Sequence, residues 1–141
     1  MLNPKPIKVI IDTNLWISFL IGKELSQLKA LIVEDEVQPV FSEESLEELK
    51  LVTQRPKLQK YFPKEKVDEL LHFLKAVSVL VKIESKVAIC RDPKDNYLLA
   101  MAKDSQANYL VTSDQDLLIL EKFYDTKIIT YRKFFQTIFG E

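Results

Sequence analysis

Two aspartates each follow a short apolar run that has the composition of a β-strand. Asp12 comes directly after Ile7–Ile11, and two residues separate Asp114 from Tyr109–Val111. Open α/β sheets bind ligands beyond the carboxyl ends of their strands, so both carboxylates are expected at one edge of a sheet. Each could instead cap the helix that follows it. For the later helix, Ser113 or Asp116 could fill that role equally well.

Two further acids lie on predicted helices. Asp95 precedes Leu98, Leu99 and Ala102 by helical spacing and therefore shares their buried face. Its alternative role is to interact with the helix dipole, because Asp92 and Pro93 begin that helix. Glu48 lies at the margin of an apolar stripe and would ordinarily be a solvated helix residue.

Four carboxylates at one sheet edge cannot all stay ionised without cations, because their mutual repulsion raises their pKa values. An all-oxygen site suits the hard cations Mg²⁺ or Mn²⁺ better than zinc. Such ions activate water and bind phosphate, so this chemistry needs no catalytic histidine. The chain has one histidine and one cysteine, Cys90, which cannot build a structural zinc site. Its two glycines lie in no phosphate-binding loop.

The elements that would position these acids alternate between strand and helix. Alternation of this kind predicts an α/β fold, a three-layer sandwich with a mainly parallel central sheet flanked by helices. The expected strands are Ile7–Ile11, Val37–Phe41 with an interruption at Pro39, Val77–Ile83, Tyr109–Val111 and Lys127–Thr130. The expected helices contain Leu15–Leu20, Leu25–Ile32, Leu46–Val52, Val67–Leu74, Leu98–Ala102, Leu117–Leu120 and Phe134–Ile138.

A length of 141 residues favours one domain over residues 1–141. No apolar stretch is long enough to cross a bilayer, and Met1–Lys8 has no signal-peptide core. A single cysteine fits a reducing compartment, and we therefore expect a cytoplasmic protein.

The charges are distributed unevenly, although the net charge is −1. Residues 34–48 carry seven acids and no base, whereas residues 50–66 carry six bases and one acid. Such runs are ordinarily solvated helix faces. A basic rim beside an acidic centre would alternatively suit a phosphate-bearing substrate.

The ordered motifs resemble those of the PIN-domain ribonucleases. The motifs are Asp12-Thr13-Asn14, Glu48 within Leu46–Leu49, Asp92-Pro93-Lys94-Asp95-Asn96 and Thr112-Ser113-Asp114-Gln115-Asp116. No single motif is specific to this family, but the whole set of motifs, in this order and in a chain of this length, is. The likeness runs from about Ile7 to Phe139 and is greatest to PIN-family (VapC-like) toxins of toxin–antitoxin pairs.

The resemblance assigns the family's catalytic and metal-binding acids to Asp12, Glu48, Asp95 and Asp114, with Asp116 as a less regular further ligand. Asn14 and Ser113 match polar positions that support the site. The resemblance also implies Mg²⁺- or Mn²⁺-dependent cleavage of single-stranded RNA, a homodimer, and inhibition by a small cognate antitoxin protein. The aromatic residues available near the chain end for a dimer are Phe123, Tyr124, Phe134, Phe135 and Phe139.

Other classes of α/β protein share parts of this pattern. A non-catalytic RNA-binding or regulatory module could use the same fold, although it would have no need of four repelling carboxylates. An aspartyl phosphatase would have a second aspartate two residues after Asp12, where this chain has Asn14. A phospho-accepting receiver domain would have acids before Asp12, where this chain has Lys8-Val9-Ile10-Ile11.

The basic run of residues 50–66 generates a first testable prediction. If it lines the path of RNA, charge reversal at Lys57 and Lys60 lowers RNA affinity and leaves metal affinity unchanged, because the lysines act by neutralising phosphates. Fluorescence anisotropy over a series of salt concentrations measures this. Unchanged affinity at low salt would identify the run as an ordinary solvated surface.

Overall fold

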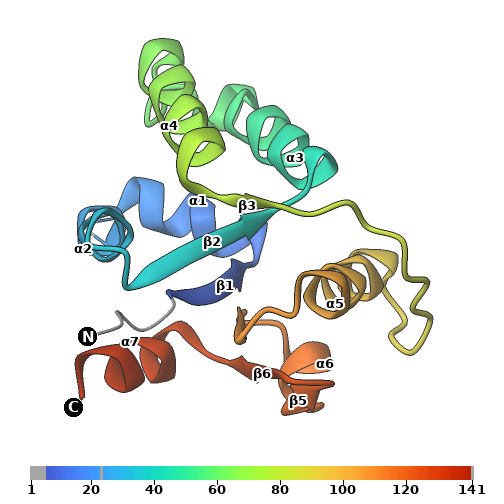
Figure 1. Cartoon of the computed structure of the whole chain (residues 1–141). Coiled ribbons are helices and arrows are strands. Elements are labelled where there is room, and N and C mark those ends of the chain that lie inside the picture. Colours follow the sequence, from blue (N-terminus) through green and yellow to red (C-terminus); the bar gives the residue numbers. More distant parts are fainter. Residues whose placement is uncertain (1–5, 23, 141) are drawn as a thin grey trace.

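A six-stranded sheet in the order β3-β2-β1-β4-β6-β5 forms the middle of the computed structural model, which describes residues 6–22 and 24–140 (Figure 1). All neighbouring strands are parallel except β5 and β6. The strands are β1 (Ile7–Ile11), β2 (Val37–Phe41), β3 (Val79–Leu80), β4 (Tyr109–Val111), β5 (Lys122–Phe123) and β6 (Thr126–Ile129). The predicted α/β architecture with a mainly parallel sheet is confirmed.

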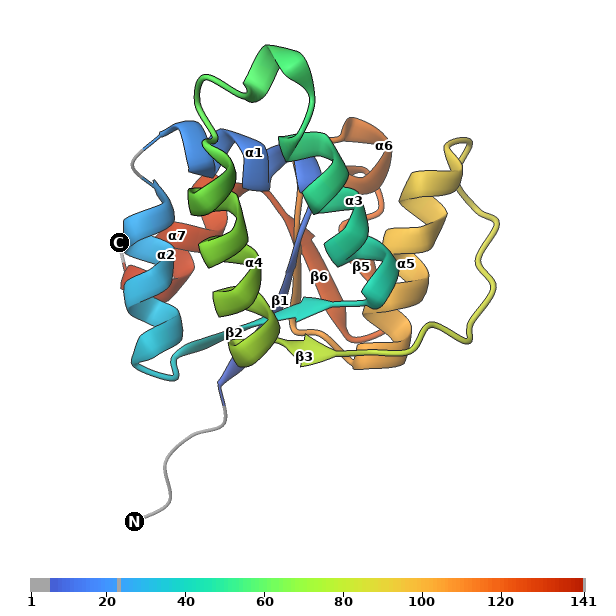
Figure 2. The same cartoon turned by 90° about the horizontal axis from the view of Figure 1, so that it is seen from above.

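Helices cover both faces of this sheet, so the strands are apolar on both sides. The helices are α1 (Thr13–Ile21), α2 (Glu24–Val33), α3 (Glu43–Thr53), α4 (Lys64–Val77), α5 (Pro93–Ser105), α6 (Gln115–Leu118) and α7 (Tyr131–Phe139). Figure 2 shows α2, α4 and α7 to one side of the strands and α5 and α6 to the other. No helix in the described part of the chain has the length and apolar character to cross a membrane.

Alternate residues of β1 build two separate cores. Val9 and Ile11 pack in one cluster with Trp16, whereas Ile10 packs in the other with Leu99 and Leu110. All of these side chains except Ile11 are almost completely buried, and Ile11 is 6% exposed. The nearly continuous apolar run that predicted β1 is therefore explained by helices on both faces.

The connections leave β1 in opposite directions along the sheet, and this places a ligand-binding edge between β1 and β4. The chain passes from β1 to β2 and β3 on one side, and later returns to β4 on the other. Open α/β sheets bind ligands where the strand order reverses in this way. The residues that immediately follow β1 and β4 are therefore the ones that the topology brings together.

The structure corrects several predicted boundaries. The strand predicted at Val77–Ile83 is shorter, since Val77 ends α4 and only Val79–Leu80 pair with β2. Pairing ends there because β2 itself ends at Phe41, whose carbonyl accepts the amide of Val81. Pro39 does not interrupt β2, where it lies opposite Val9 in the parallel register.

Two further differences concern short elements. The helix predicted to contain Leu46–Val52 ends at Thr53, and Pro56–Leu58 form a separate 3₁₀ turn. Strand β5 was not predicted because its two residues are too few to show periodicity. It forms a hairpin with β6 through Tyr124, whose φ is 52°.

A long extended segment joins β3 to α5, and hydrogen bonds hold this segment against the C-terminal end of that helix. Asp104 accepts hydrogen bonds from the amides of Glu84 at 2.6 Å and Ser85 at 2.8 Å, and from the Ser85 hydroxyl. Burial by itself raises the pKa of Asp104, but these hydrogen bonds and the charge of Lys103 outweigh burial and lower it. The segment is thereby held against α5 before it reaches the acidic residues.

We expect Asp104→Ala to destabilise the fold by about 1 kcal/mol at neutral pH. The variant loses hydrogen bonds to a charged group, which stabilise the folded state. Partial solvation of this carboxylate limits the size of the effect. The lowered pKa means that the contribution is present above the unfolded pKa and is lost as pH falls through the folded value. Urea denaturation at pH 7 and below pH about 4 tests both parts. Asp125→Ala, at an exposed acid, is the control; equal stability of the two variants at pH 7 would contradict the prediction.

Candidate metal centre

Asp12 and Asp114 lie at the ends of neighbouring β1 and β4, as the sequence predicts. Each caps the helix that follows: Asp12 Oδ1 accepts the amide of Asn14 at 3.2 Å, and Asp114 Oδ1 accepts the amide of Asp116 at 2.9 Å. The capping roles that were weighed against a metal-binding role therefore both occur. A cap occupies one lone pair of one carboxylate oxygen, and the remaining acceptor positions are still available for a cation.

Thr112 joins these two aspartates. Its hydroxyl, fully buried, donates to Asp12 Oδ2 at 3.0 Å and accepts the amide of Asp114 at 3.1 Å. Ser113, the neighbouring residue predicted to support the site, has an exposed side chain instead. The signal that could have identified Thr112 is its place as the first residue after β4, where alternation turns its side chain toward Asp12.

Asp95 is the most constrained acid in the site. Its side chain is 3% exposed, and its Oδ2 is buried without a hydrogen-bond partner in the described structure. Burial is the largest cause of the raised pKa of Asp95. Hydrogen bonding to Asp114 and repulsion from its charge raise this pKa further, and the charges of Asp92 and Asp12 add smaller contributions. Together these bring it to about 6. A buried carboxylate oxygen of this kind needs a proton or a cation.

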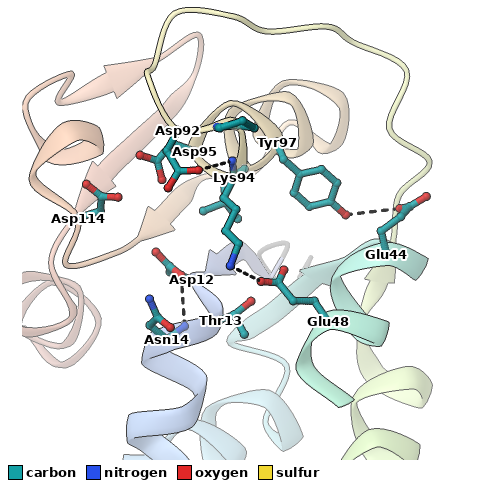
Figure 3. Close-up of a pocket in the computed structure, with 12 residues that line it drawn as sticks. Asp12, Thr13, Asn14, Glu44, Glu48, Asp92, Lys94, Asp95, Tyr97 and Asp114 are labelled. Carbon is teal, nitrogen blue, oxygen red and sulfur yellow. Dashed lines mark hydrogen bonds and ion pairs between the residues drawn. The ribbon is translucent and has the colours of Figure 1, made fainter. Parts of the chain in front are cut away.

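Asp95, Asp114 and Asp116 form a group that could hold a cation. One carboxylate oxygen from each lies within 4.8 Å of the others. Asp12 lies outside this group but lines the same pocket as Asp95 and Asp114 (Figure 3). Asp116, predicted as a further ligand, belongs to this group, and it also forms an ion pair with Arg91 at 3.1 Å.

Glu48 faces the aspartates from α3 on the opposite wall. Its Oε1 lies 3.6 Å from Nζ of Lys94, which extends from α5 across the pocket (Figure 3). Tyr97 links the same two helices, since its hydroxyl contacts Ser42 and donates to Glu44 at 3.4 Å. Polar contacts therefore connect α3 and α5 across the pocket.

These side chains enclose a pocket of about 350 Å³. Asn14, predicted as a supporting residue, is exposed at its margin and contributes its amide to the Asp12 cap. The other lining residues are Asp12, Thr13, Glu44, Glu48, Asp92, Pro93, Lys94, Asp95, Tyr97, Leu98 and Asp114. The pocket therefore brings together all four acids that the sequence predicted as catalytic.

The donor set fits a hard divalent cation. The three grouped acids offer oxygen ligands only. One of them, Asp95, has a buried oxygen, Oδ2, that accepts no hydrogen bond in the described part of the chain. Mg²⁺ and Mn²⁺ prefer such ligands and commonly retain water in the remaining positions. The arrangement can therefore hold a metal ion and leave room for a phosphate, as required for phosphodiester hydrolysis.

Comparisons with known proteins agree with this site. A family model described as PIN domain matches residues 8–116, which include Asp12, Glu48, Asp95, Asp114 and Asp116. The chain is also similar to the uncharacterized protein MJ1680 of Methanocaldococcus jannaschii. The two are 34% identical over 117 residues, which cover 81% of this chain and 75% of that protein. No solved structure matches the chain.

The raised pKa of Asp95 generates a prediction about stability without metal. A carboxyl whose pKa is higher in the folded than in the unfolded state loses stability as pH rises from the unfolded value of about 3.9 to the folded value of about 6. Each pKa unit corresponds to about 1.4 kcal/mol, whereas the helix-dipole interaction of this residue contributes roughly 0.3–1 kcal/mol. Asp95→Asn should therefore be at least as stable as wild type in EDTA at pH 7, with a smaller advantage at pH 4.

Thermal melts at both pH values, in EDTA and in Mn²⁺, provide the measurement. Mn²⁺ should raise the melting temperature of wild type more than that of Asp95→Asn, since a ligand bound by the native state stabilises it. Glu47→Gln, on the exposed part of α3, is the matched control for loss of one negative charge. A variant that melts well below wild type in EDTA would show that Asp95 is chiefly a structural residue of α5.

Proposed function

Because the chain belongs to the PIN-domain family, we propose that it is a metal-dependent endoribonuclease that cleaves single-stranded RNA. PIN domains are generally metal-dependent nucleases, and the acidic cluster of this chain is compatible with that activity. The observation that carries the proposal is Asp95 Oδ2, a buried oxygen without a partner in the described structure, which lies beside Asp114. A scaffold that only bound RNA would gain nothing from burying that charge.

The catalytic residues in this proposal are Asp12, Glu48, Asp95 and Asp114. Asp12, Asp95 and Asp114 would bind Mg²⁺ or Mn²⁺. Asp116 would be a further ligand. When bound, such an ion supplies an activated water and neutralises phosphate charge.

Supporting residues keep these carboxylates in place. Thr112 orients Asp12 by donating to Oδ2, which keeps that oxygen directed along the edge between β1 and β4. Glu48 is placed to orient a water molecule from the α3 wall once its ion pair with Lys94 opens. Asn14 and Ser113 are assigned supporting roles on the resemblance alone.

From the resemblance to VapC-like toxins we also propose a biological role. The chain would act in the cytoplasm as a single domain over residues 1–141, as the toxin of a toxin–antitoxin pair, and would be held inactive by a small cognate antitoxin. A short neighbouring gene for a DNA-binding protein would support this role. The alternative is an RNA-binding or regulatory module without catalysis, which the cleavage assay below distinguishes.

A homodimer is proposed on the same basis. Of the aromatic residues considered for it, Phe134 is fully buried and Tyr124 is 61% exposed, whereas the side chain of Phe139 lies outside the described residues. Phe135 packs against the core. Sedimentation at micromolar concentration should show a species of twice the 16.4 kDa chain mass. A monomer alone would contradict it.

Catalysis is tested by Asp12→Asn, which keeps the side-chain shape and the capping oxygen but removes the charge. We expect RNA cleavage to fall by more than the roughly 10–100-fold that loss of a supporting residue costs, with an unchanged circular dichroism spectrum. The assay uses a labelled single-stranded RNA with Mn²⁺ or EDTA, and Glu47→Gln is the control. Full activity of Asp12→Asn, or of wild type in EDTA, would contradict the proposed mechanism. RNA binding without cleavage by wild type would support the non-catalytic alternative.

A further inference from the structure

Two exposed basic side chains are each paired with an acid of the candidate metal centre. Arg91 donates to Asp116 Oδ1 at 3.2 Å and Oδ2 at 3.1 Å, and Lys94 Nζ lies 3.6 Å from Glu48 Oε1. The Arg91 and Lys94 side chains are 89% and 73% exposed. In this arrangement the two cations compensate carboxylates to which the proposed function assigns roles at the metal site.

The backbone that carries both cations is held firmly, although their side chains extend into solvent. The side-chain amide of Asn96 exchanges two hydrogen bonds with the backbone of Cys90, at 2.8 and 2.9 Å. Asp92 caps α5 by accepting the amide of Lys94 at 2.9 Å. The backbone of Arg91 and Lys94 is therefore held in place at the N-terminus of α5, while their long side chains are exposed.

The two ion pairs are easily replaced by a metal ion. Exposed ion pairs contribute little to stability, because water screens them and long side chains lose freedom in forming them. A divalent ion bound directly by several carboxylates interacts with them far more strongly. Metal binding at Asp116, and the approach of Glu48 to the metal or its water, would therefore compete with Arg91 and Lys94 for the same oxygens.

We propose that Arg91 and Lys94 are RNA-phosphate ligands that metal binding releases from Asp116 and Glu48. This inference rests on the proposed function. Without metal, the acidic pocket repels RNA and the two cations are engaged with acids; with metal, the acids are neutralised and both cations face the entrance. RNA and metal then bind cooperatively, and by reciprocity each raises the affinity for the other.

Metal affinity without RNA is the first test. Arg91→Gln, Lys94→Gln and the double variant are titrated with Mn²⁺ by isothermal calorimetry, with Lys86→Gln, an exposed residue of the preceding segment, as the control. Removing a competing cation should leave Mn²⁺ affinity equal to wild type or raise it by up to about fivefold per pair. A loss of Mn²⁺ affinity in these variants would overturn the competition on which the proposal depends.

RNA affinity is the second test, measured by anisotropy with a labelled single-stranded RNA while a parallel gel shows the RNA to be intact. Each phosphate contact to single-stranded nucleic acid adds about 0.7 to the slope of log affinity against log salt concentration. In Mn²⁺ the double variant should bind at least about tenfold more weakly than wild type, with a slope smaller by about 1.4. In EDTA the double variant and wild type should bind RNA equally weakly.

The outcomes separate this inference from the proposed function. If wild type binds Mn²⁺ but the double variant keeps the wild-type slope in Mn²⁺, the cations do not contact RNA and the inference fails alone. If the slopes differ equally in Mn²⁺ and EDTA, or if Lys86→Gln behaves like the double variant, release by metal is wrong. If wild type binds no Mn²⁺, the proposed metal-dependent function fails as well.

Discussion

The carboxylate of Asp95 is buried beside a second carboxylate, and the surrounding structure is arranged around that unfavourable placement. A buried acid that lacks a partner must be protonated or must bind a cation. The pKa of about 6 describes the first solution, and the oxygens of Asp114 and Asp116 offer the second. At neutral pH the cation is favoured, because the proton is then largely lost from the folded protein.

The fold maintains this arrangement with rigid elements. Asp12 and Asp114 follow adjacent parallel strands, and Thr112 hydrogen-bonds to both. Asp95 is carried by α5, whose Leu98 and Leu99 pack in the core beneath it. A metal-binding residue on such elements loses little conformational freedom when the ion binds, since its backbone is already ordered.

Much of this site follows from the sequence, because its main acids are placed by periodic elements. Asp12 follows a strand, and Asp95 lies at helical spacing from three buried residues. The periodicity of the sequence therefore predicts that both acids lie at this edge of the sheet. The pairs Arg91–Asp116 and Lys94–Glu48 could not be predicted, since they join residues 25 and 46 positions apart across irregular turns. Thr112 was missed for a different reason: the adjacent Ser113 matches the family's motif, although alternation beyond the predicted strand at Tyr109–Val111 favours Thr112 as the buried hydroxyl.

The central claim is that Asp95, Asp114 and Asp116 share a divalent cation, and anomalous diffraction from crystals grown with Mn²⁺ tests it most directly. The account predicts an anomalous peak in direct coordination with Asp95 and Asp114, with the Asp116–Arg91 ion pair opened. A peak elsewhere on the surface, or the same acids unchanged and without a peak at saturating Mn²⁺, would contradict it.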